Sequence, residues 1–496
     1  MRRGPLADSY PSAVALVVFS LVPYLALTAG VFPLSSLIGK STGLSPAMMD
    51  LTVALSTAGY AVGTVLAVQF AVHLRPRRML LFYETLFVTA CVLAASASNG
   101  DVFMGAFIAQ GLVTSLMLIA AVPPLVTGWP AKKMPTTGLV MNLCIFGAVA
   151  AGPTIGAAEL YGGSWRPFFW GVAGIAFFAL LFSLLTFEDD EPIGEAPVDI
   201  AALGLTVIGC AAAFFGAGKL QATLRAGPVS LVPLIAGTAL VVLLVAYQYV
   251  RRNPLMPVRQ ASTSMPVMGI FVALTASASA FGAMELLLVV LKTSSTPLDT
   301  AYIFLPEFVA AVVVAGLFGA LFRTRYTPVL ALSGLLAVTA AAGLLIAAVP
   351  APSPILGVAT GLLGLGVAAS VSPALFIAGF SLRSQMLQRV FAMIELMRGV
   401  TAFLVAPILI FLAAALAKSR LAGIRDSLWI CLGIAAVGFV GGAVLYMTSR
   451  RRLVVPDLET WQEEGEPAWE SPRLFARLRR ETREDDRSEE DAEVAA

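Results

Sequence analysis

The sequence has little charge, one histidine and few cysteines. Charged residues make up 12% of the 496 residues, about half the share in soluble domains. The single histidine, His73, argues against a catalytic or metal centre built on imidazoles. The four cysteines, Cys91, Cys144, Cys210 and Cys431, lie in apolar runs without metal-ligand spacing, so buried free thiols are expected. The sequence therefore predicts no metal site and no cofactor.

Motifs for nucleotide binding and hydrolysis are also missing. The sequence contains no GxxxxGK[ST] phosphate loop, no GxSxG and no HExxH. ATP is therefore not expected to drive this protein directly, and no catalytic residue is predicted. The formal net charge of +2 gives no strong attraction to nucleic acid.

Long apolar runs dominate the chain. Hydrophobic residues account for 58% of it and the mean hydropathy is +0.87. A helix needs about 20 apolar residues to cross the hydrocarbon core. The first run continues to Leu37 without a small-residue cleavage site, so it is interpreted as a retained span rather than a signal peptide. The fold class predicted is an all-α membrane protein of about fourteen transmembrane helices. The expected spans are 13–36, 47–72, 79–98, 102–127, 136–160, 165–186, 198–217, 229–250, 264–291, 299–322, 328–349, 353–380, 388–416 and 427–448.

The spacing of these runs predicts two six-helix bundles with two extra central helices between them. The last segment is rich in charge, has no long apolar run and is expected to be disordered. The predicted organisation is a cytoplasmic N-terminus (1–12), an N-terminal bundle (13–187), an acidic cytoplasmic linker (188–197), two extra helices (198–252), a C-terminal bundle (264–449) and a charged cytoplasmic tail (450–496).

The distribution of lysine and arginine orients the chain. If the N-terminus is cytoplasmic, the loops on that side carry roughly twice as many basic residues as the loops on the other side. Both termini are therefore predicted to be cytoplasmic. The abundance of Ala, Val, Gly and Arg indicates a bacterial source, so the expected location is the bacterial cytoplasmic membrane.

A glycine-rich segment with a proline stands in the fifth span. It reads GAVAAGPTIGAAELYGGSWRPFFW over residues 147–170, with Gly152, Pro153 and Gly156 at its core. Small residues allow close helix packing, and proline bends a helix. The segment resembles the antiporter motif of the major facilitator superfamily. That resemblance implies a helix that contacts the opposite half and seals the cavity in exporters.

The arrangement of six, two and six spans resembles the drug:proton antiporters of the same superfamily. Gln110–Gly111, Asp199 and the segment 389–403 with Arg398 are similar to other family motifs. The resemblance implies a cavity between two bundles that opens alternately to each side. It also implies a small-molecule substrate, protons as the coupling ion and a protein that acts as a monomer.

The chain departs from the family pattern at several positions. Arg75, Arg77 and Arg78 correspond to the cytoplasmic gating loop, but Val72 stands where the family has an acidic residue. Phe107 replaces an arginine of the fourth span, and the middle of the first span has no acid.

Glu285 and Glu307 lie inside predicted spans and are the expected proton or cation sites. An ionisable group at mid-membrane costs about 2.5–3.5 kcal/mol on insertion scales, so it needs a reason. A carboxyl whose surroundings alternate between water and a dry interior can load and release a proton.

The remaining ionisable residues of the spans are expected to find a partner or to reach solvent. Glu395 and Arg398 are three residues apart on one helix face. Either they neutralise each other, or Arg398 binds an anionic group or modulates Glu395, so both are also candidates for proton coupling or substrate binding. Glu84 lies near the basic loop at 75–78 and is expected to pair with it. Asp50 is near a span end, where contact with solvent is expected.

The function that these observations favour is secondary active transport, with proton-coupled export of a small amphiphilic or cationic compound. Alternatives are a carrier of the same fold for a lipid, siderophore or endogenous metabolite, and a non-transporting membrane sensor or scaffold. A lipid-modifying membrane enzyme is less favoured because no catalytic constellation is found.

Overall fold

The computed structural model describes residues 6, 8–186, 198–349, 354–415, 419–449, 454–469, 471 and 474, apart from the side chain of Pro76. The acidic linker expected at 188–197 lies outside the described residues, as do 1–5 and most of the tail after 469.

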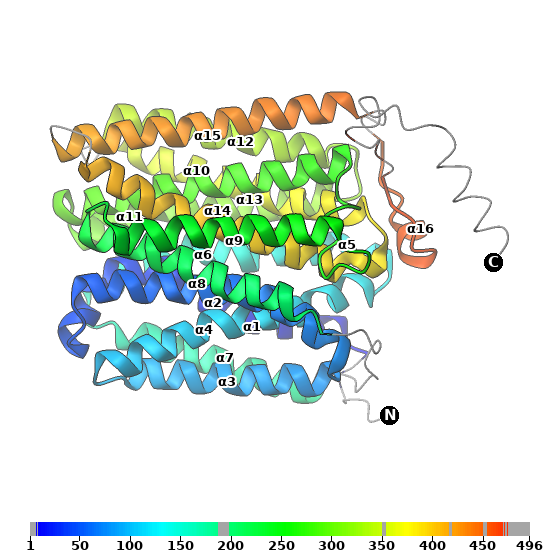
Figure 1. Cartoon of the computed structure of the whole chain (residues 1–496), viewed down its shortest axis with the longest axis horizontal. Helices are drawn as coiled ribbons and strands as arrows, with labels where there is room; N and C mark the ends of the chain where they lie inside the picture. Colours follow the sequence, from blue (N-terminus) through cyan, green and yellow to red (C-terminus); the bar gives the residue numbers. More distant parts are fainter. Residues whose placement is uncertain are drawn as a thin grey trace.

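Helices account for all the regular elements in this described part of the chain. The long helices run nearly parallel to one another along the longest axis of the molecule (Figure 1). The α-helices are α1 (Tyr10–Thr42), α2 (Pro46–His73), α3 (Pro76–Ser96), α4 (Gly100–Thr127), α5 (Met134–Asn142), α6 (Ala148–Tyr161), α7 (Arg166–Thr186), α8 (Ile200–Thr223), α9 (Pro228–Val250), α10 (Ser264–Ser294), α11 (Pro297–Leu321), α12 (Thr327–Ala348), α13 (Pro354–Phe380), α14 (Leu387–Ala415), α15 (Arg420–Thr448) and α16 (Leu458–Glu463).

The prediction of fourteen spans is confirmed. Fourteen helical segments of the described chain are long and apolar enough to cross a membrane. The fifth span is composite: a 3₁₀ turn, η1 (Ala131–Lys133), precedes α5, and a π-helical segment, η2 (Leu143–Gly147), joins α5 to α6. Segments of π-helix inside α-helices are frequent at functional sites. The protein is a multi-pass membrane protein.

Local sequence signals start these helices where the apolar runs begin. Asn99 accepts a hydrogen bond from the backbone N–H of Val102 at 2.9 Å, and Asp199 accepts one from Ala202 at 3.1 Å. These side chains satisfy backbone donors that have no partner inside the helix. Proline stands at the first turn of many of the other helices, where its missing N–H costs nothing.

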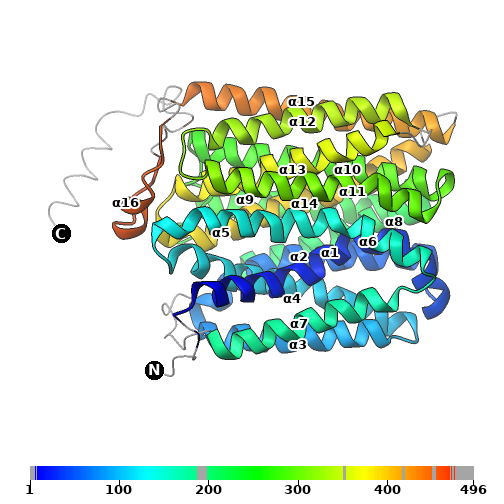
Figure 2. The same ribbon diagram turned by 180° about the vertical axis from the view of Figure 1, so that it is seen from behind.

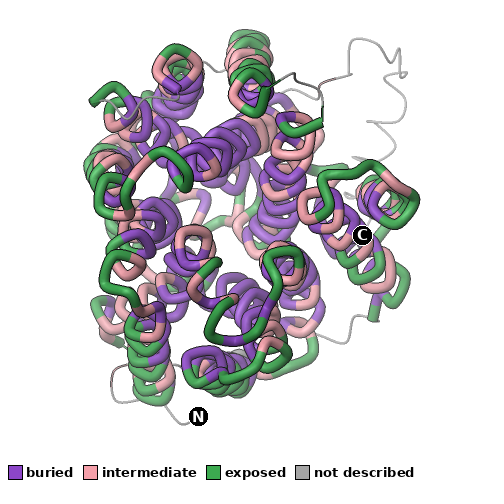
Figure 3. The backbone as a smooth tube through the Cα atoms, turned by 90° about the vertical axis from the view of Figure 1, so that its left-hand side faces the viewer, coloured by how far each residue is buried: buried purple, intermediate pink, exposed green. Residues whose placement is uncertain are grey.

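The helices form two groups with two further helices beside them. In the first group, α1 packs on α4, α6 and α7, and α2 and α3 pack on α4. In the second group, α10 packs on α13, α14 and α15, while α12 packs on α13 and α15 and α11 on α13. The groups meet where α11 contacts α5 and α6, and where α14 contacts α2. Viewed along the helices, buried residues fill the interior and exposed ones form much of the rim (Figure 3).

Apolar side chains cover the outer surface. Exposed examples are Phe82 in α3, Phe177 in α7, Val232 in α9 and Val437 in α15. An apolar outer surface is stable where the surrounding solvent is lipid.

The start of α1 and the short helix α16 lie at the same end of the helices (Figure 2). We call this end the termini face and the other end the opposite face.

The expectation of a disordered tail is wrong for residues 454–469. This segment contains α16, and the side chains of Trp461 and Trp469 are 0% and 4% exposed. The sequence analysis missed this because two buried tryptophans give no apolar run. Their burial depends on the surface that they meet.

Candidate functional site

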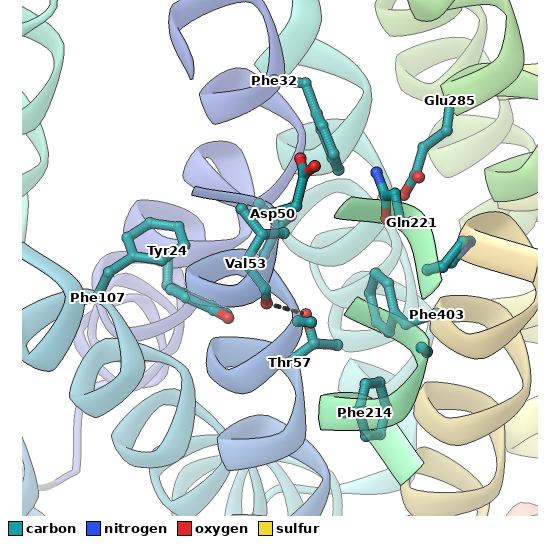
Figure 4. A pocket seen from close by; sticks show the side chains of 14 residues that line it. Tyr24, Phe32, Asp50, Val53, Thr57, Phe107, Phe214, Gln221, Glu285 and Phe403 are labelled. Atoms are coloured by element: carbon teal, nitrogen blue, oxygen red, sulfur yellow. Dashed lines mark hydrogen bonds between the residues drawn. The ribbon is translucent and has the colours of Figure 1, made fainter. Parts of the chain in front are cut away.

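A cavity of about 570 Å³, here called the main cavity, lies between the two groups. Its lining residues Phe32 and Gln221 are in the last third of helices that end at the opposite face, and Asp50 is near the start of α2 at that same face. The cavity therefore occupies the half of the protein nearer the opposite face. Figure 4 shows its walls. The lining residues are Tyr24, Thr28, Phe32, Asp50, Val53, Ala54, Thr57, Phe107, Phe214, Ala217, Gln221, Glu285, Phe403 and Pro407.

The cavity is acidic and aromatic. Two carboxyl side chains, Asp50 from the first group and Glu285 from the second, line it, and its described lining contains no lysine or arginine. The two carboxyls lie close enough to interact electrostatically, and Lys292 interacts with Asp50. Negative charge with aromatic faces is a site suited to an organic cation.

Asp50 is the acidic residue that the sequence analysis assigned to solvent. Asp50 is only four residues from the start of α2, which suggested a position at the end of the span, in contact with solvent. The cavity extends deeply enough into this half of the protein to include that position. The prediction for Glu285 as a cavity residue agrees with its placement, although its role in binding protons or cations stays a prediction.

A second cavity of about 310 Å³ contains Glu307. The side chain of Glu307 is 7% exposed, and its Oε2 atom has no hydrogen-bond partner in the described chain. Gly364 makes room for it, because a Cβ atom there would lie 2.8 Å from the Cγ atom of Glu307. A buried carboxyl without a partner is costly, and such groups in membrane helices are associated with function.

A third cavity of about 380 Å³ shares walls with the other two and is lined by Arg398. Tyr24 and Phe403 belong to both this cavity and the main cavity. Phe146 and Phe281 belong to both this cavity and the one with Glu307. The three cavities thus lie in sequence along the boundary between the groups.

Glu395 and Arg398 form a buried ion pair, as one of the two interpretations expected. The Arg398 Nε atom lies 3.2 Å from both carboxylate oxygens, and its Nη2 atom also contacts Oε2. Tyr60 of α2 donates a hydrogen bond to Glu395 at 3.1 Å. Because α2 and α14 belong to different groups, this cluster connects them. The guanidinium of Arg398 also lies over the ring of Phe146, with its Cζ atom 5.9 Å from the ring centroid.

The π-helical segment places two residues that the sequence analysis did not identify. Phe146 is inside it and forms walls of two cavities. Asn142, just before it, donates a hydrogen bond from Nδ2 to the carbonyl of Ala368 in α13 at 2.9 Å. No sequence pattern marks a π-helical segment, so neither position could be recognised as an inter-group contact.

The glycines of the segment that resembles the antiporter motif pack against α1 of the same group. A Cβ atom at Gly152 would lie 2.5 Å from the carbonyl oxygen of Ala26, and one at Gly156 would lie 3.0 Å from the carbonyl carbon of Gly30. The opposite group is reached by Thr154, whose hydroxyl donates to the carbonyl of Ala301 at 3.4 Å. Pro153 is buried within the same helix.

The basic loop stabilises the first group at the termini face. Arg77 donates to the carbonyl of Leu184 at the end of α7, at 3.1 Å, while Arg78 is exposed. Arg75 is partly buried at the start of α3. Cations near the last carbonyls of a helix are stabilising.

The expectation that Glu84 pairs with the basic loop is wrong. Glu84 instead accepts a hydrogen bond from the hydroxyl of Ser20 in α1 at 2.9 Å. Glu84 is two helical turns beyond the loop on α3, and its side chain points into the first group, where it is 1% exposed.

The two groups are joined at the termini face by several contacts. Gln388 of α14 donates to the carbonyl of Ile119 in α4 at 3.1 Å. In addition, α11 packs closely on α5, and a Cβ atom at Gly319 would lie 3.0 Å from the Cβ atom of Leu139. Gly319 therefore permits the two helices to approach where the groups meet.

The segment containing α16 crosses the termini face and contacts both groups. Trp461 donates to the carbonyl of Leu382 at 2.8 Å, and its ring packs edge-on against Phe380 with centroids 4.7 Å apart. The next residue, Gln462, donates to the carbonyls of Thr127 at 3.0 Å and Trp129 at 2.7 Å. Phe380 ends α13 of the second group, and Leu382 follows it. Thr127 ends α4 of the first group, and Trp129 follows it. We call residues 457–463 the latch.

Comparisons with known proteins identify the family. The model of the Major Facilitator Superfamily matches residues 16–407. An uncharacterized MFS-type transporter of Bacillus subtilis (strain 168), YcnB, is 22% identical over 183 residues. This match spans 37% of the present chain and 39% of that relative, so the aligned part covers well under half of YcnB.

The crystal structure of the human organic anion transporter MFSD10 (TETRAN) has a similar fold. The TM-score is 0.60 at 14% identity, covering 87% of the present chain and 99% of that one. The family model covers most of the chain, and the fold agrees with it. This chain therefore belongs to the Major Facilitator Superfamily, a family of membrane transporters rather than enzymes.

Proposed function

We propose that this transporter exports small amphiphilic cations in exchange for protons across a bacterial cytoplasmic membrane. The observation that carries the proposal is the main cavity, in which Asp50 and Glu285 stand among five aromatic side chains without a basic residue in the described lining. The aromatic lining residues are Tyr24, Phe32, Phe107, Phe214 and Phe403. An amphiphilic cation would be held by the carboxyls and by the ring faces together.

In this proposal the termini face is cytoplasmic and the described state faces outward. The basic residues of the loops support that orientation. The groups are in contact at the termini face through Gln388 and the latch, while the main cavity lies toward the opposite face. Alternating access then requires the contacts at the termini face to open while the groups close around the cavity.

Glu307 and the cluster of Glu395, Arg398 and Tyr60 have separate roles in this mechanism. Glu307 is a buried carboxyl with one oxygen lacking a partner in the described chain, and a carboxyl binds a proton in dry surroundings and releases it in wet ones. The cluster joins the groups, so switching between states must exchange or break the hydrogen bond from Tyr60. Since Arg398 is neutralised by Glu395, it is a poor site for an anionic substrate.

Transport of fluorescent cations by purified protein in liposomes tests the proposal. With an imposed pH gradient, the parent should move the cation, and a dye inside the vesicles should report counterflow of protons. Glu285→Gln should lower cation flux roughly 10- to 150-fold, the loss expected for one charge-assisted contact of about 1.5–3 kcal/mol. Glu307→Gln should abolish the dependence on the pH gradient.

Asp101→Asn is the matched control. Asp101 is an exposed acid in the first turn of α4 and lines none of the three cavities. The proposal is overturned if the cavity variants transport like the parent, or if the parent moves no cation while a reconstituted anionic compound is carried.

A further inference from the structure

We infer that α8 is a wall of the cargo cavity and that Gln221 on this helix selects protonated amines over quaternary ammonium compounds. The inference rests on the proposed function, since it concerns the same cavity. It assigns a role to a helix that belongs to neither of the two groups.

Helix α8 lies beside the boundary between the two groups. It packs on α2 of the first group and on α14 of the second. Its outer side is covered by α9 at close range, since a Cβ atom at Gly216 would lie 2.6 Å from the carbonyl oxygen of Ser230. The inner side of α8 is thus left facing the boundary at which the main cavity lies.

One stripe of α8 reaches the cavity. Phe214, Ala217 and Gln221 line it and are spaced by three and four residues, which places them on one helix face. Figure 4 shows Gln221, Phe214 and Glu285 among the side chains that line the cavity. The site therefore combines carboxyls from both groups with an amide from a third element.

Hydrogen bonds connect the start of α8 to α2 of the first group and to α9. The backbone N–H of Asp199 donates to Gln69 of α2 at 3.1 Å. The Asp199 carboxylate accepts from Tyr247 at 3.2 Å and from Gln248 at 3.3 Å, and it pairs with Arg251 at 3.3 Å. Asp199 is only 4% exposed, so this buried network holds the helix in a fixed place. This network anchors the start of α8 beside α2, and the packing of α8 on α2 and α9 holds Gln221 in the cavity wall.

The chemistry of the amide decides what it selects. A glutamine has a carbonyl acceptor and an NH₂ donor. A protonated amine can donate an N–H to the carbonyl, whereas a quaternary ammonium group has no N–H. The carboxyl charges and aromatic rings of the cavity attract both kinds of cation, and the carboxyl oxygens can also accept an N–H from the protonated amine. The amide of Gln221 adds to this preference, because its acceptor is satisfied by the protonated amine and left without a partner by the quaternary ammonium group.

The test compares two fluorescent probes that differ only by N-methylation, a tertiary amine in its protonated form and its quaternary derivative. Binding to detergent-solubilised protein is measured by fluorescence polarisation and flux by the liposome assay. Gln221→Leu should weaken binding and flux of the protonated amine about tenfold, and change those of the quaternary probe less than about twofold. Gln221→Asn should retain part of the preference, since it keeps the amide.

Thr223→Val is the control on the same helix, because Thr223 is exposed and lies outside the cavity lining. Equal losses for both probes in Gln221→Leu, or no change in either, would overturn the assignment of selectivity. Cation flux that is independent of the pH gradient would overturn proton coupling. The role of Gln221 would then still be decided by the ratio of protonated-amine to quaternary-probe binding in parent and variant. A parent that neither binds nor moves either probe would overturn both proposals.

Discussion

Replacing Trp461 by alanine should open the termini face by releasing the latch. The side chain is 0% exposed, and it donates a hydrogen bond and packs on Phe380. Truncating a buried tryptophan costs about 3–5 kcal/mol. A six-residue helix such as α16 has no stability of its own, so this loss falls on the docking of the latch rather than on the fold of the bundle.

The contacts of Gln462 determine how much the latch favours the closed termini face. Its two hydrogen bonds to the first group exist only while the groups are together at this face. At about 0.5–1.5 kcal/mol each, they favour the closed termini face by about 1–3 kcal/mol, or roughly 5- to 150-fold in population. Releasing the latch should remove this bias.

Distances between spin labels measure the shift directly. Lys132 of η1 and Arg325 in the loop before α12 are exposed and belong to different groups. Cysteines at these positions can carry the labels once the four native cysteines, all buried, are replaced. Trp461→Ala should add a population with a longer distance that is absent or small in the parent.

Two further variants separate the latch from a general loss of structure. Gln462→Leu should cause much of the same shift while Trp461 stays docked, because it removes only the contacts to the first group. Glu459→Gln should leave the distances unchanged. Glu459 forms an exposed 3.0 Å ion pair with Arg323, which follows α11 of the second group, so this pair does not connect the two groups. Proteolysis that shows a released tail with an unchanged distance distribution would refute the reasoning.

The remaining predictions concern stability. Gly152→Ala should lower the thermal stability of purified protein by about 1–3 kcal/mol through overpacking against Ala26, whereas Gly174→Ala, where a Cβ atom meets nothing within 4 Å, should not; equal melting temperatures for the two would contradict the packing argument. Glu395→Gln should destabilise the protein by about 3–5 kcal/mol because it leaves Arg398 buried and unpaired. Adding Arg398→Met should recover much of that loss in thermal unfolding, and a double variant no more stable than Glu395→Gln would argue against the ion pair as the cause.

Several features of the site were predictable from local sequence. Glu285 and Glu307 stand out as acids within apolar runs, and both are found at cavities. The three-residue spacing of Glu395 and Arg398 indicated a shared helix face, and the two residues pair. Their roles in binding protons or cations stay predictions, as do the domain boundaries.

Other features needed contacts between distant segments. Asp50 lies near a helix end in the sequence, yet it lines the same cavity as Glu285 of α10. Nothing in the sequence around Gln221 distinguishes it from any polar residue near a span end. Glu84 has a partner in α1 rather than in the adjacent basic loop, because the direction of its side chain depends on how α3 packs.

The sequence by itself determined the solvent, the long apolar helices and the number of spans. Each of these depends on a local quantity, namely the length and hydropathy of a continuous run, because in lipid every backbone group must be satisfied within its own helix. Only the tertiary structure decided which helices meet, that α8 faces the cavity and that the tail crosses the termini face. Between helices that are apolar on all sides hydropathy gives no direction, so close packing at small residues and a few hydrogen bonds between distant residues determine the arrangement.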